Sequence, residues 1–217
     1  MTRLKINLLV LTLLFPLLSL SAQETWVSLN GVFRSYTQNE SYDSSIDKTT
    51  ETDLGYGLKG MHFFNEHIGA YASINIFTPQ SWDLTYTDGD EDDNDLSTGM
   101  DTATGFGYML GVAGTISPTD VLDFYMALGY AGTKVTLQES DSDDNFLYKY
   151  ESRLRGVGTD FGVKLNVQES VYLNVGTSLI VQLWADEEMT DSDYSESGTS
   201  TMASLDVRPY FGFGISF

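Results

Sequence analysis

The residues best suited to chemistry in this sequence are carboxylates, and they are concentrated in short acidic stretches. These are DGDEDDND at 88–95, ESDSDDN at 139–145 and DEEMTDSDYSE at 186–196. Carboxylate oxygens are ligands that Ca²⁺ and Mg²⁺ prefer, and alternate acidic positions begin a calcium-binding EF-hand loop. The residues with that alternate spacing are Asp88, Asp90, Asp92, Asp141 and Asp143. The glycine and the final glutamate of the motif are missing, so we expect no resident cofactor and at most loosely bound Ca²⁺ or Mg²⁺.

Other groups that commonly carry catalysis or ligand binding are scarce. The chain has no cysteine, which excludes disulfides, thiolate catalysis and cysteine-bound metals. His62 and His67 are the two histidines; both fall beside one short predicted turn, and no nucleophile is positioned next to them. We therefore predict that the protein is not an enzyme. The formal net charge of −20, from 31 acidic and 11 basic residues, also excludes binding to nucleic acid through a basic patch.

The first 22 residues have the composition of a secretory signal. Arg3 and Lys5 precede an apolar run at 8–18, and small residues follow it. An N-terminal membrane anchor is the alternative, but the apolar run is short for a spanning helix. We expect residues 1–22 to be cleaved and 23–217 to form one domain.

The rest of the chain repeatedly alternates apolar and polar residues with a period of two. In VYLNVGTSLIVQL at 171–183, one face is almost entirely apolar and the other is mostly small or polar. This period is typical of a strand and not of a helix. The predicted strands are 25–38, 52–64, 68–78, 102–115, 122–137, 150–167, 171–185 and 200–217.

The connections between these predicted strands alternate in length. Those after the second, fourth and sixth strands are short, at 65–67, 116–121 and 168–170. Those after the first, third, fifth and seventh are long and acidic, at 39–51, 79–101, 138–149 and 186–199. This alternation is typical of an outer-membrane barrel. It predicts an all-β, eight-stranded antiparallel up-and-down transmembrane barrel with four long acidic extracellular loops. A soluble lipocalin-like barrel is the alternative fold.

The polar face of each predicted strand is rich in glycine and also carries charges. A face in water gains nothing from so much glycine, whereas a narrow lumen needs small residues. Charges inside a lumen must pair or be hydrated, because an isolated buried charge is costly. We predict a lumen network of ion pairs, with Arg208 as one hub; the alternative is that some of these charges lie at the rims in water. The candidate residues are Arg34, Lys59, Asp123, Asp160, Lys164, Asp206 and Arg208.

Aromatic residues near the strand ends, and one proline, complete the sequence-based expectations. The aromatic residues predict two interfacial girdles. The girdle near the short turns contains Trp26, Phe63, Phe64, Phe213 and Phe217, and the girdle toward the long loops contains Phe33, Phe77 and Trp184. Pro209 interrupts the last strand and removes a ladder hydrogen bond, so we predict a β-bulge there.

Together, the signal, the eight amphipathic strands, the four long loops and the terminal Phe217 resemble the small eight-stranded outer-membrane proteins of the OmpA, OmpX and OmpW type. The resemblance covers about 24–217. It implies a location in the outer membrane of a Gram-negative-type bacterium. It also implies that the row Phe211, Phe213, Ile215 and Phe217 matches the insertion signal read by the outer-membrane assembly machinery.

We expect a monomer with a filled lumen and a structural or surface-interaction role. Its expected partners are outer-membrane lipid, the assembly machinery and an extracellular partner that contacts the acidic loops. A narrow channel or small-ligand porter is the alternative function. An eight-stranded interior is just wide enough for side chains, which argues against an open pore.

Overall fold

The computed structural model describes residues 24–42, 45–85, 91–92, 102–140, 146–191 and 195–217. The strands are β1 (Glu24–Tyr42), β2 (Ser45–Phe63), β3 (Ile68–Thr85), β4 (Glu91–Asp92), β5 (Thr102–Thr119), β6 (Leu122–Ser140), β7 (Phe146–Gln168), β8 (Val171–Asp191) and β9 (Ser195–Ser216). The predicted signal peptide lies outside the described residues. Among the described residues no helix is long and apolar enough to cross a membrane.

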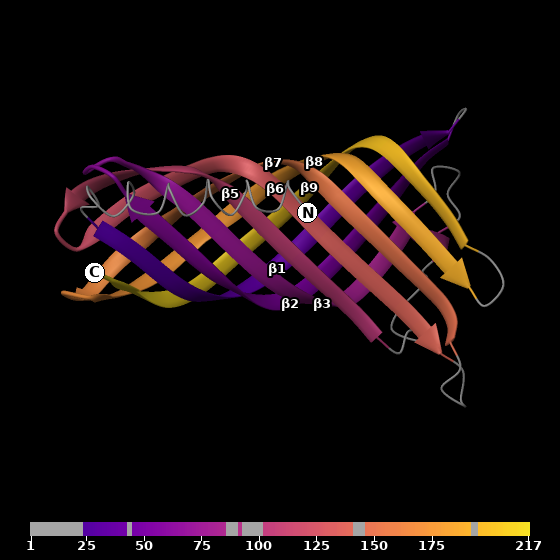
Figure 1. The fold of residues 1–217 in the computed structure, drawn as a ribbon, viewed down its shortest axis with the longest axis horizontal. Helices are drawn as coiled ribbons and strands as arrows, with labels where there is room; N and C mark the ends of the chain where they lie inside the picture. Colours follow the sequence, from indigo (N-terminus) through magenta and orange to yellow (C-terminus); the bar gives the residue numbers. More distant parts are fainter. Residues whose placement is uncertain (1–23, 43–44, 86–90, 93–101, 141–145, 192–194) are drawn as a thin grey trace, which may run out of the picture.

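Eight long antiparallel strands close into a barrel, which confirms the predicted fold class (Figure 1). Each strand pairs with its neighbours along the chain, apart from the two-residue β4, which lies beside β3. β1 closes the ring by pairing with both β2 and β9. Beyond β9, Phe217 and Thr25 exchange backbone hydrogen bonds of 3.0 and 2.8 Å, so the last residue is part of the ladder. Within the barrel, no strand edge is left open at this end.

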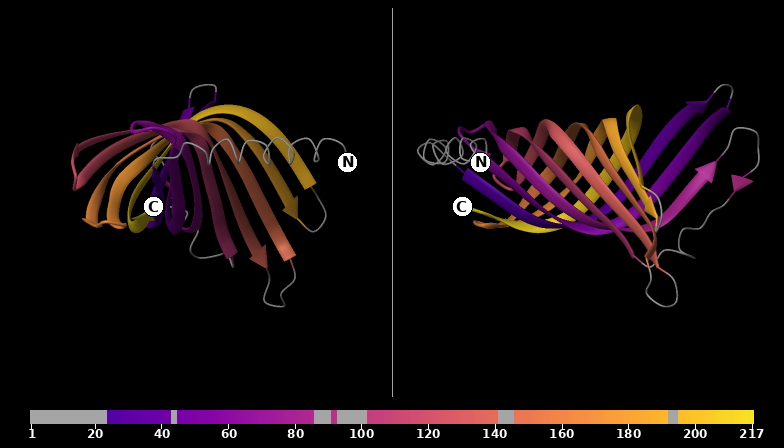
Figure 2. Two further views of the ribbon diagram at one scale, coloured as in Figure 1. Left: turned by 60° about the vertical axis from the view of Figure 1, so that its left-hand side comes forward. Right: turned by 45° about the vertical axis from the view of Figure 1, so that its right-hand side comes forward.

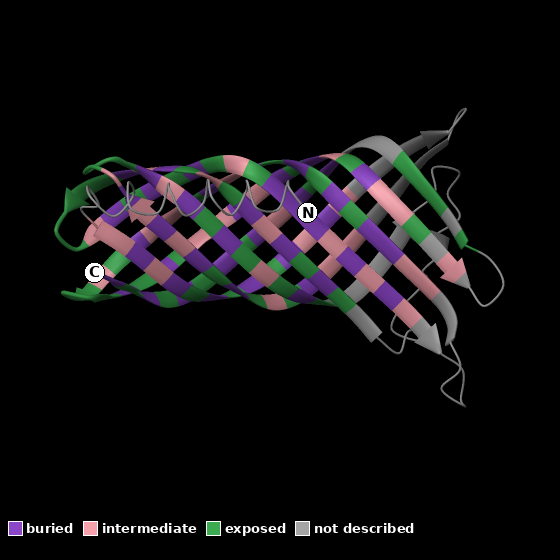
Figure 3. Ribbon diagram, in the orientation of Figure 1, coloured by how far each residue is buried: buried purple, intermediate pink, exposed green. Residues whose placement is uncertain are grey.

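The alternation of side chains places large apolar residues on the outside of the barrel. Leu128 and Phe213 are each 61% exposed, whereas Ser28 and Asn174 are buried inside. Buried and exposed residues form a checkerboard over the wall (Figure 3). A soluble barrel would turn its apolar face inward. An outer wall this apolar is the arrangement expected for contact with lipid.

The strands are longer than the alternation predicted, because they continue into the acidic segments. β1 and β2 remain paired as far as Tyr42 and Ser45, and β8 and β9 as far as Thr190 and Ser195. The predicted loops at 39–51 and 186–199 are therefore largely strand. Polar residues on both faces remove the alternation signal there, while the backbone can still form its ladder.

The barrel wall divides toward the loop end. Pairing of β3 with β5 ends at Phe77 and Gly105, and pairing of β1 with β9 ends at Gln38 and Ser204. Past these points β1–β3 and β5–β9 continue as two separate sheets (Figure 2). The closed part of the barrel is therefore shorter than its strands.

Pro209 lies in β9 without a bulge, so that prediction was wrong. It pairs with Thr177 of β8, and no register shift occurs there. On the other side, pairing with β1 stops after Val32 and Tyr210 and resumes at Ser35 and Val207 in the same register. The missing N–H of proline is thus accommodated as a short gap in the ladder, with no extra residue.

Candidate functional site

The lumen contains a cluster of two arginines around the carboxylate of Asp206. Arg34 of β1 donates from Nε to Asp206 Oδ2 at 3.0 Å. Arg208 of β9 donates from Nε to Oδ1 at 2.9 Å and from Nη2 to Oδ2 at 2.6 Å. Arg34 also pairs with Asp53, and with Glu51 at 3.2 Å. Arg34, Asp53, Asp206 and Arg208 are at most 1% exposed. Each of these buried charges lies next to an opposite charge, which offsets the cost of removing it from water.

A second cluster surrounds Asp160 of β7. Its Oδ2 accepts hydrogen bonds from Lys59 Nζ at 2.8 Å, from the Tyr71 hydroxyl at 2.9 Å and from the Ser178 hydroxyl. Its Oδ1 accepts one from the Tyr210 hydroxyl at 2.8 Å. Lys59 Nζ also lies 3.2 Å from the centre of the Tyr210 ring. These contacts join β2, β3, β7, β8 and β9 across the interior.

A third cluster lies near the short-turn end. Lys164 Nζ lies 3.0 Å from Glu24 Oε1 and 3.3 Å from Asp123 Oδ2. It also sits 3.9 Å from the centre of the Trp26 ring. The cation therefore ties β7 to β1 and β6 at this end of the lumen.

The structure places every predicted lumen charge inside the barrel and brings these residues together in the clusters above. They are Arg34, Lys59, Asp123, Asp160, Lys164, Asp206 and Arg208. Arg208 contacts Asp206 and Thr133, while Asp206 is the carboxylate that both arginines share. Sequence reasoning missed Asp53, Glu51 and Glu24 as partners. Asp53 could have been found, because it has the same inward phase as Lys59 in β2.

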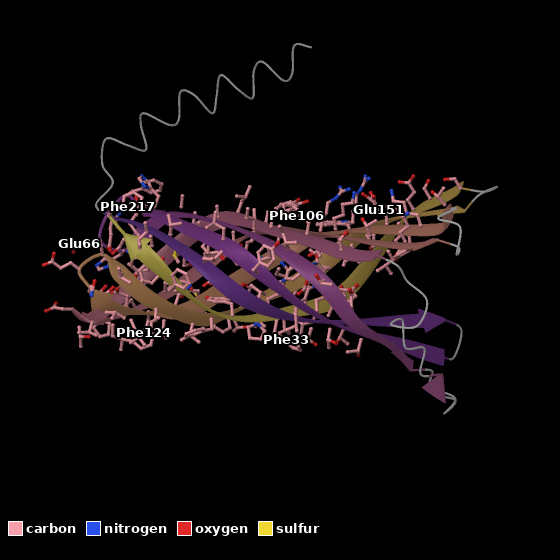
Figure 4. The ribbon with its side chains drawn as sticks, turned by 90° about the horizontal axis from the view of Figure 1, so that it is seen from below. Phe33, Glu66, Phe106, Phe124, Glu151 and Phe217 are labelled. Atoms are coloured by element: carbon pink, nitrogen blue, oxygen red, sulfur yellow. The ribbon has the colours of Figure 1, made fainter. Side chains whose placement is uncertain are left out.

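Aromatic side chains fill the lumen, which corrects part of the predicted girdles. Trp26, Phe63 and Phe77 are at most 2% exposed and point inward. The Trp26 and Phe63 ring centres are 4.7 Å apart. The predicted girdle residues that do face outward include Phe33 and Phe217 (Figure 4). These buried aromatic residues point inward because they alternate along their strands with residues that face outward.

Tyr210 lies so close to the wall that its neighbours have no room for a side chain. A Cβ added at Gly176 would be 2.2 Å from the Tyr210 hydroxyl, and one at Gly162 would be 2.7 Å from it. Glycine is therefore needed at both positions for this ring to cross the lumen. The glycine-rich inner face provides this room.

Between the described side chains of the first two clusters, little free space remains. The central cavity has a volume of about 10 Å³, enough for roughly one water molecule. Its lining residues are Asn30, Val32, Lys59, Ser73, Asn75, Ser178, Arg208 and Tyr210. Toward the short turns a hollow of about 450 Å³ is lined by residues including Trp26 and Phe63.

The metal candidates Asp88, Asp90, Asp141 and Asp143 lie outside the described residues, and for Asp92 only its backbone position in β4 is described. In the described part of the chain no group of three or more His, Asp or Glu side chains could hold a metal ion. His62 Nδ1 lies 3.0 Å from the Thr25 hydroxyl, and His67 is exposed in the turn before β3.

No protein-family model and no curated protein matches this sequence. Solved structures do match. Outer membrane protein AlkL, determined in lipid bilayers, is 11% identical with a TM-score of 0.60, covering 89% of this chain and 90% of its own. OprG from Pseudomonas aeruginosa is 11% identical with a TM-score of 0.57, covering 91% and 97%. Neisserial surface protein A is 8% identical with a TM-score of 0.55, covering 89% and 97%. The chain has the fold of the small outer-membrane β-barrels.

Proposed function

We propose that this protein is an outer-membrane barrel with a sealed lumen, whose role is structural or lies in the surface it presents outside the cell. The observation that carries the proposal is the filling of the lumen. Aromatic side chains and three ion-pair clusters occupy the interior, and the central cavity admits roughly one water molecule. A route for solute through the barrel would require these buried pairs to separate.

The outer wall supports placement in a membrane. Large apolar side chains project outward from all eight long strands, and the polar residues they alternate with are buried inside. Phe211, Phe213, Ile215 and Phe217 form the outward row of the last strand, with 52–74% of each exposed. This row fits the C-terminal signal that the assembly machinery reads in barrels of this kind. The described part of the barrel closes on itself, which supports a monomer.

The strand extensions at the loop end support the surface role. β1–β3 and β5–β9 continue past the closed wall as two sheets, and their ends carry much of the acidic sequence. Such sheets offer broad polar faces to an extracellular partner. If binding to cells or matrix depends on this surface, deletion of residues 186–199 will abolish it while leaving the barrel folded.

Planar-bilayer recording tests the sealed lumen. Protein that shows a heat-dependent mobility shift on a detergent gel should give no discrete conductance steps after reconstitution. Steps that recur with folded protein would contradict the sealed lumen and favour a narrow channel. The absence of any mobility shift would contradict the membrane barrel itself.

A further inference from the structure

Most of the basic residues outside the lumen and the leader project from one part of the outer wall. Lys134 of β6 and Lys149, Arg153 and Arg155 of β7 have 42–53% of their side chains exposed. We call these four residues the cationic patch. The whole chain has only 11 lysines and arginines against 31 acidic residues. Four of them on two adjoining strands is a strong local excess.

A nearly buried carboxylate holds the patch together. Glu151, with 7% of its side chain exposed, lies 2.7 Å from Lys134 Nζ and 3.6 Å from Lys149 Nζ. It also accepts a hydrogen bond from Arg153 Nε at 2.8 Å. Three cations thus cover one anion, and the surface over Glu151 presents ammonium and guanidinium groups. Arg155 pairs separately with Asp186 of β8.

The patch directly adjoins the apolar part of the wall. Lys134 is paired with Phe106, and Arg155 is paired with Trp184, which is 48% exposed. Tyr108 and Tyr130 lie on the same side, with ring centres 6.2 Å apart. Glu151 lies beyond Phe106 toward the loop end (Figure 4). Aromatic residues followed by cations are the order expected where hydrocarbon gives way to lipid headgroups.

Just past the apolar row, the described outward side chains of the wall carry charge on β6 and β7 and not on β1, β2 or β3. The outward residues that follow the apolar row on β1, β2 and β3 are Ser35, Thr52 and Thr78, none of which is charged. A general attraction to an anionic surface would not need this asymmetry. Paired guanidinium and ammonium groups in a fixed cluster suit phosphate oxygens in particular.

We infer that the cationic patch binds the phosphate groups of an anionic lipid of the outer leaflet. This rests on the proposed membrane placement. Continuity with the lipid-facing wall favours a headgroup over free phosphate, because a bound lipid can keep its acyl chains against Phe106 and Trp184. The acidic Asp186 and Glu188 limit the patch on its β8 side, so the headgroup would lie over β6 and β7.

The test is titration of lipid A, a phosphorylated glycolipid, or of its dephosphorylated form into detergent-folded protein. Flotation of the protein with phosphatidylcholine vesicles separately checks the membrane placement. R153Q/R155Q should weaken lipid A binding by roughly fivefold for each charge removed, whereas R153K/R155K should keep most of it. E188Q, which removes a neighbouring negative charge, should strengthen binding. The wild type should prefer the phosphorylated lipid, and added salt should reduce the preference.

Equal lipid A affinity of the wild type and R153Q/R155Q would overturn the inference and leave the patch with a structural role only. Equal competition by inorganic phosphate at the lipid concentration would show a free-anion site and would also overturn it. Failure of the wild type to float even with pure phosphatidylcholine vesicles would contradict the proposed membrane barrel instead. R153K/R155K provides the comparison if the double glutamine variant does not fold.

Discussion

At the residue scale, Asp206 is the carboxylate on which two buried arginines depend. It accepts hydrogen bonds from Arg34 and Arg208, and none of the three is more than 1% exposed. Removing one partner of a buried ion pair leaves an uncompensated charge, which is far more costly than losing a surface pair. Each buried charge of the cluster therefore needs its partner.

Asp206→Ala should lower the free energy of unfolding by about 3–5 kcal/mol, because two guanidinium groups lose their shared carboxylate. Asp186→Ala is the matched control, since its pair with Arg155 is partly exposed and should contribute about 1 kcal/mol or less. Urea unfolding of protein folded into lipid vesicles measures both. Equal effects of the two substitutions would show that the lumen pair is not buried as described.

Glu151, outside the closed wall, gives a pH-dependent prediction. The hydrogen bond from Lys134, followed by that from Arg153, lowers the pKa of Glu151 from 4.5 to about 2. A lowered pKa in the folded state means that ionised Glu151 contributes stability above about pH 4.5, and that this contribution disappears as pH falls toward 2.

The difference in stability between wild type and Glu151→Gln should therefore be largest at neutral pH and shrink below about pH 4.5. Thermal midpoints of the heat-dependent gel shift across this range measure it. A difference that stays constant with pH would mean that the carboxylate is not held by the cations.

At the element scale, the period-two alternation of apolar and polar residues predicts most of the strand arrangement. It identified all eight long strands, the short turns and the inward direction of the lumen charges. The same alternation also places Trp26 inside, because Val27 and Leu29 mark the outward phase of β1. The girdle prediction used only the position of Trp26 along the strand and ignored that phase. Contacts across the lumen, such as Lys59 with Asp160, depend on register and strand stagger, which no local pattern reveals.

Glycines of the inner face give a prediction about strand packing. Gly176→Ala would put Cβ 2.2 Å from the Tyr210 hydroxyl and 2.4 Å from the Phe161 carbonyl oxygen, so the ring or the wall must move. We expect a loss of about 1–3 kcal/mol in unfolding free energy. Gly31→Ala is the control, because the nearest atom to its added Cβ is 3.7 Å away. Urea unfolding in which both variants resemble wild type would contradict close packing around Tyr210.

At the scale of the whole molecule, the extent of the strands could not be predicted. The acidic segments lack alternation because polar residues occupy both strand phases, yet backbone pairing carries β1, β2, β8 and β9 well past the closed wall. The division into two sheets follows from where the β3–β5 and β1–β9 pairings end, and the sequence marks neither point. The two sheets beyond the closed wall therefore depend on pairing between strands far apart in the sequence, which no local pattern predicts.

The central claim is that the apolar wall faces lipid, and spin labelling of β6 tests it most directly. The chain has no cysteine, so single-cysteine variants at Met126 and Leu128 can be labelled without background. In lipid vesicles, labels at these positions should collide often with dissolved oxygen and rarely with a water-soluble nickel complex. A label at Ser117, exposed near the β5–β6 turn, should show the opposite preference. Nickel accessibility at Met126 and Leu128 as high as at Ser117 would contradict the membrane barrel.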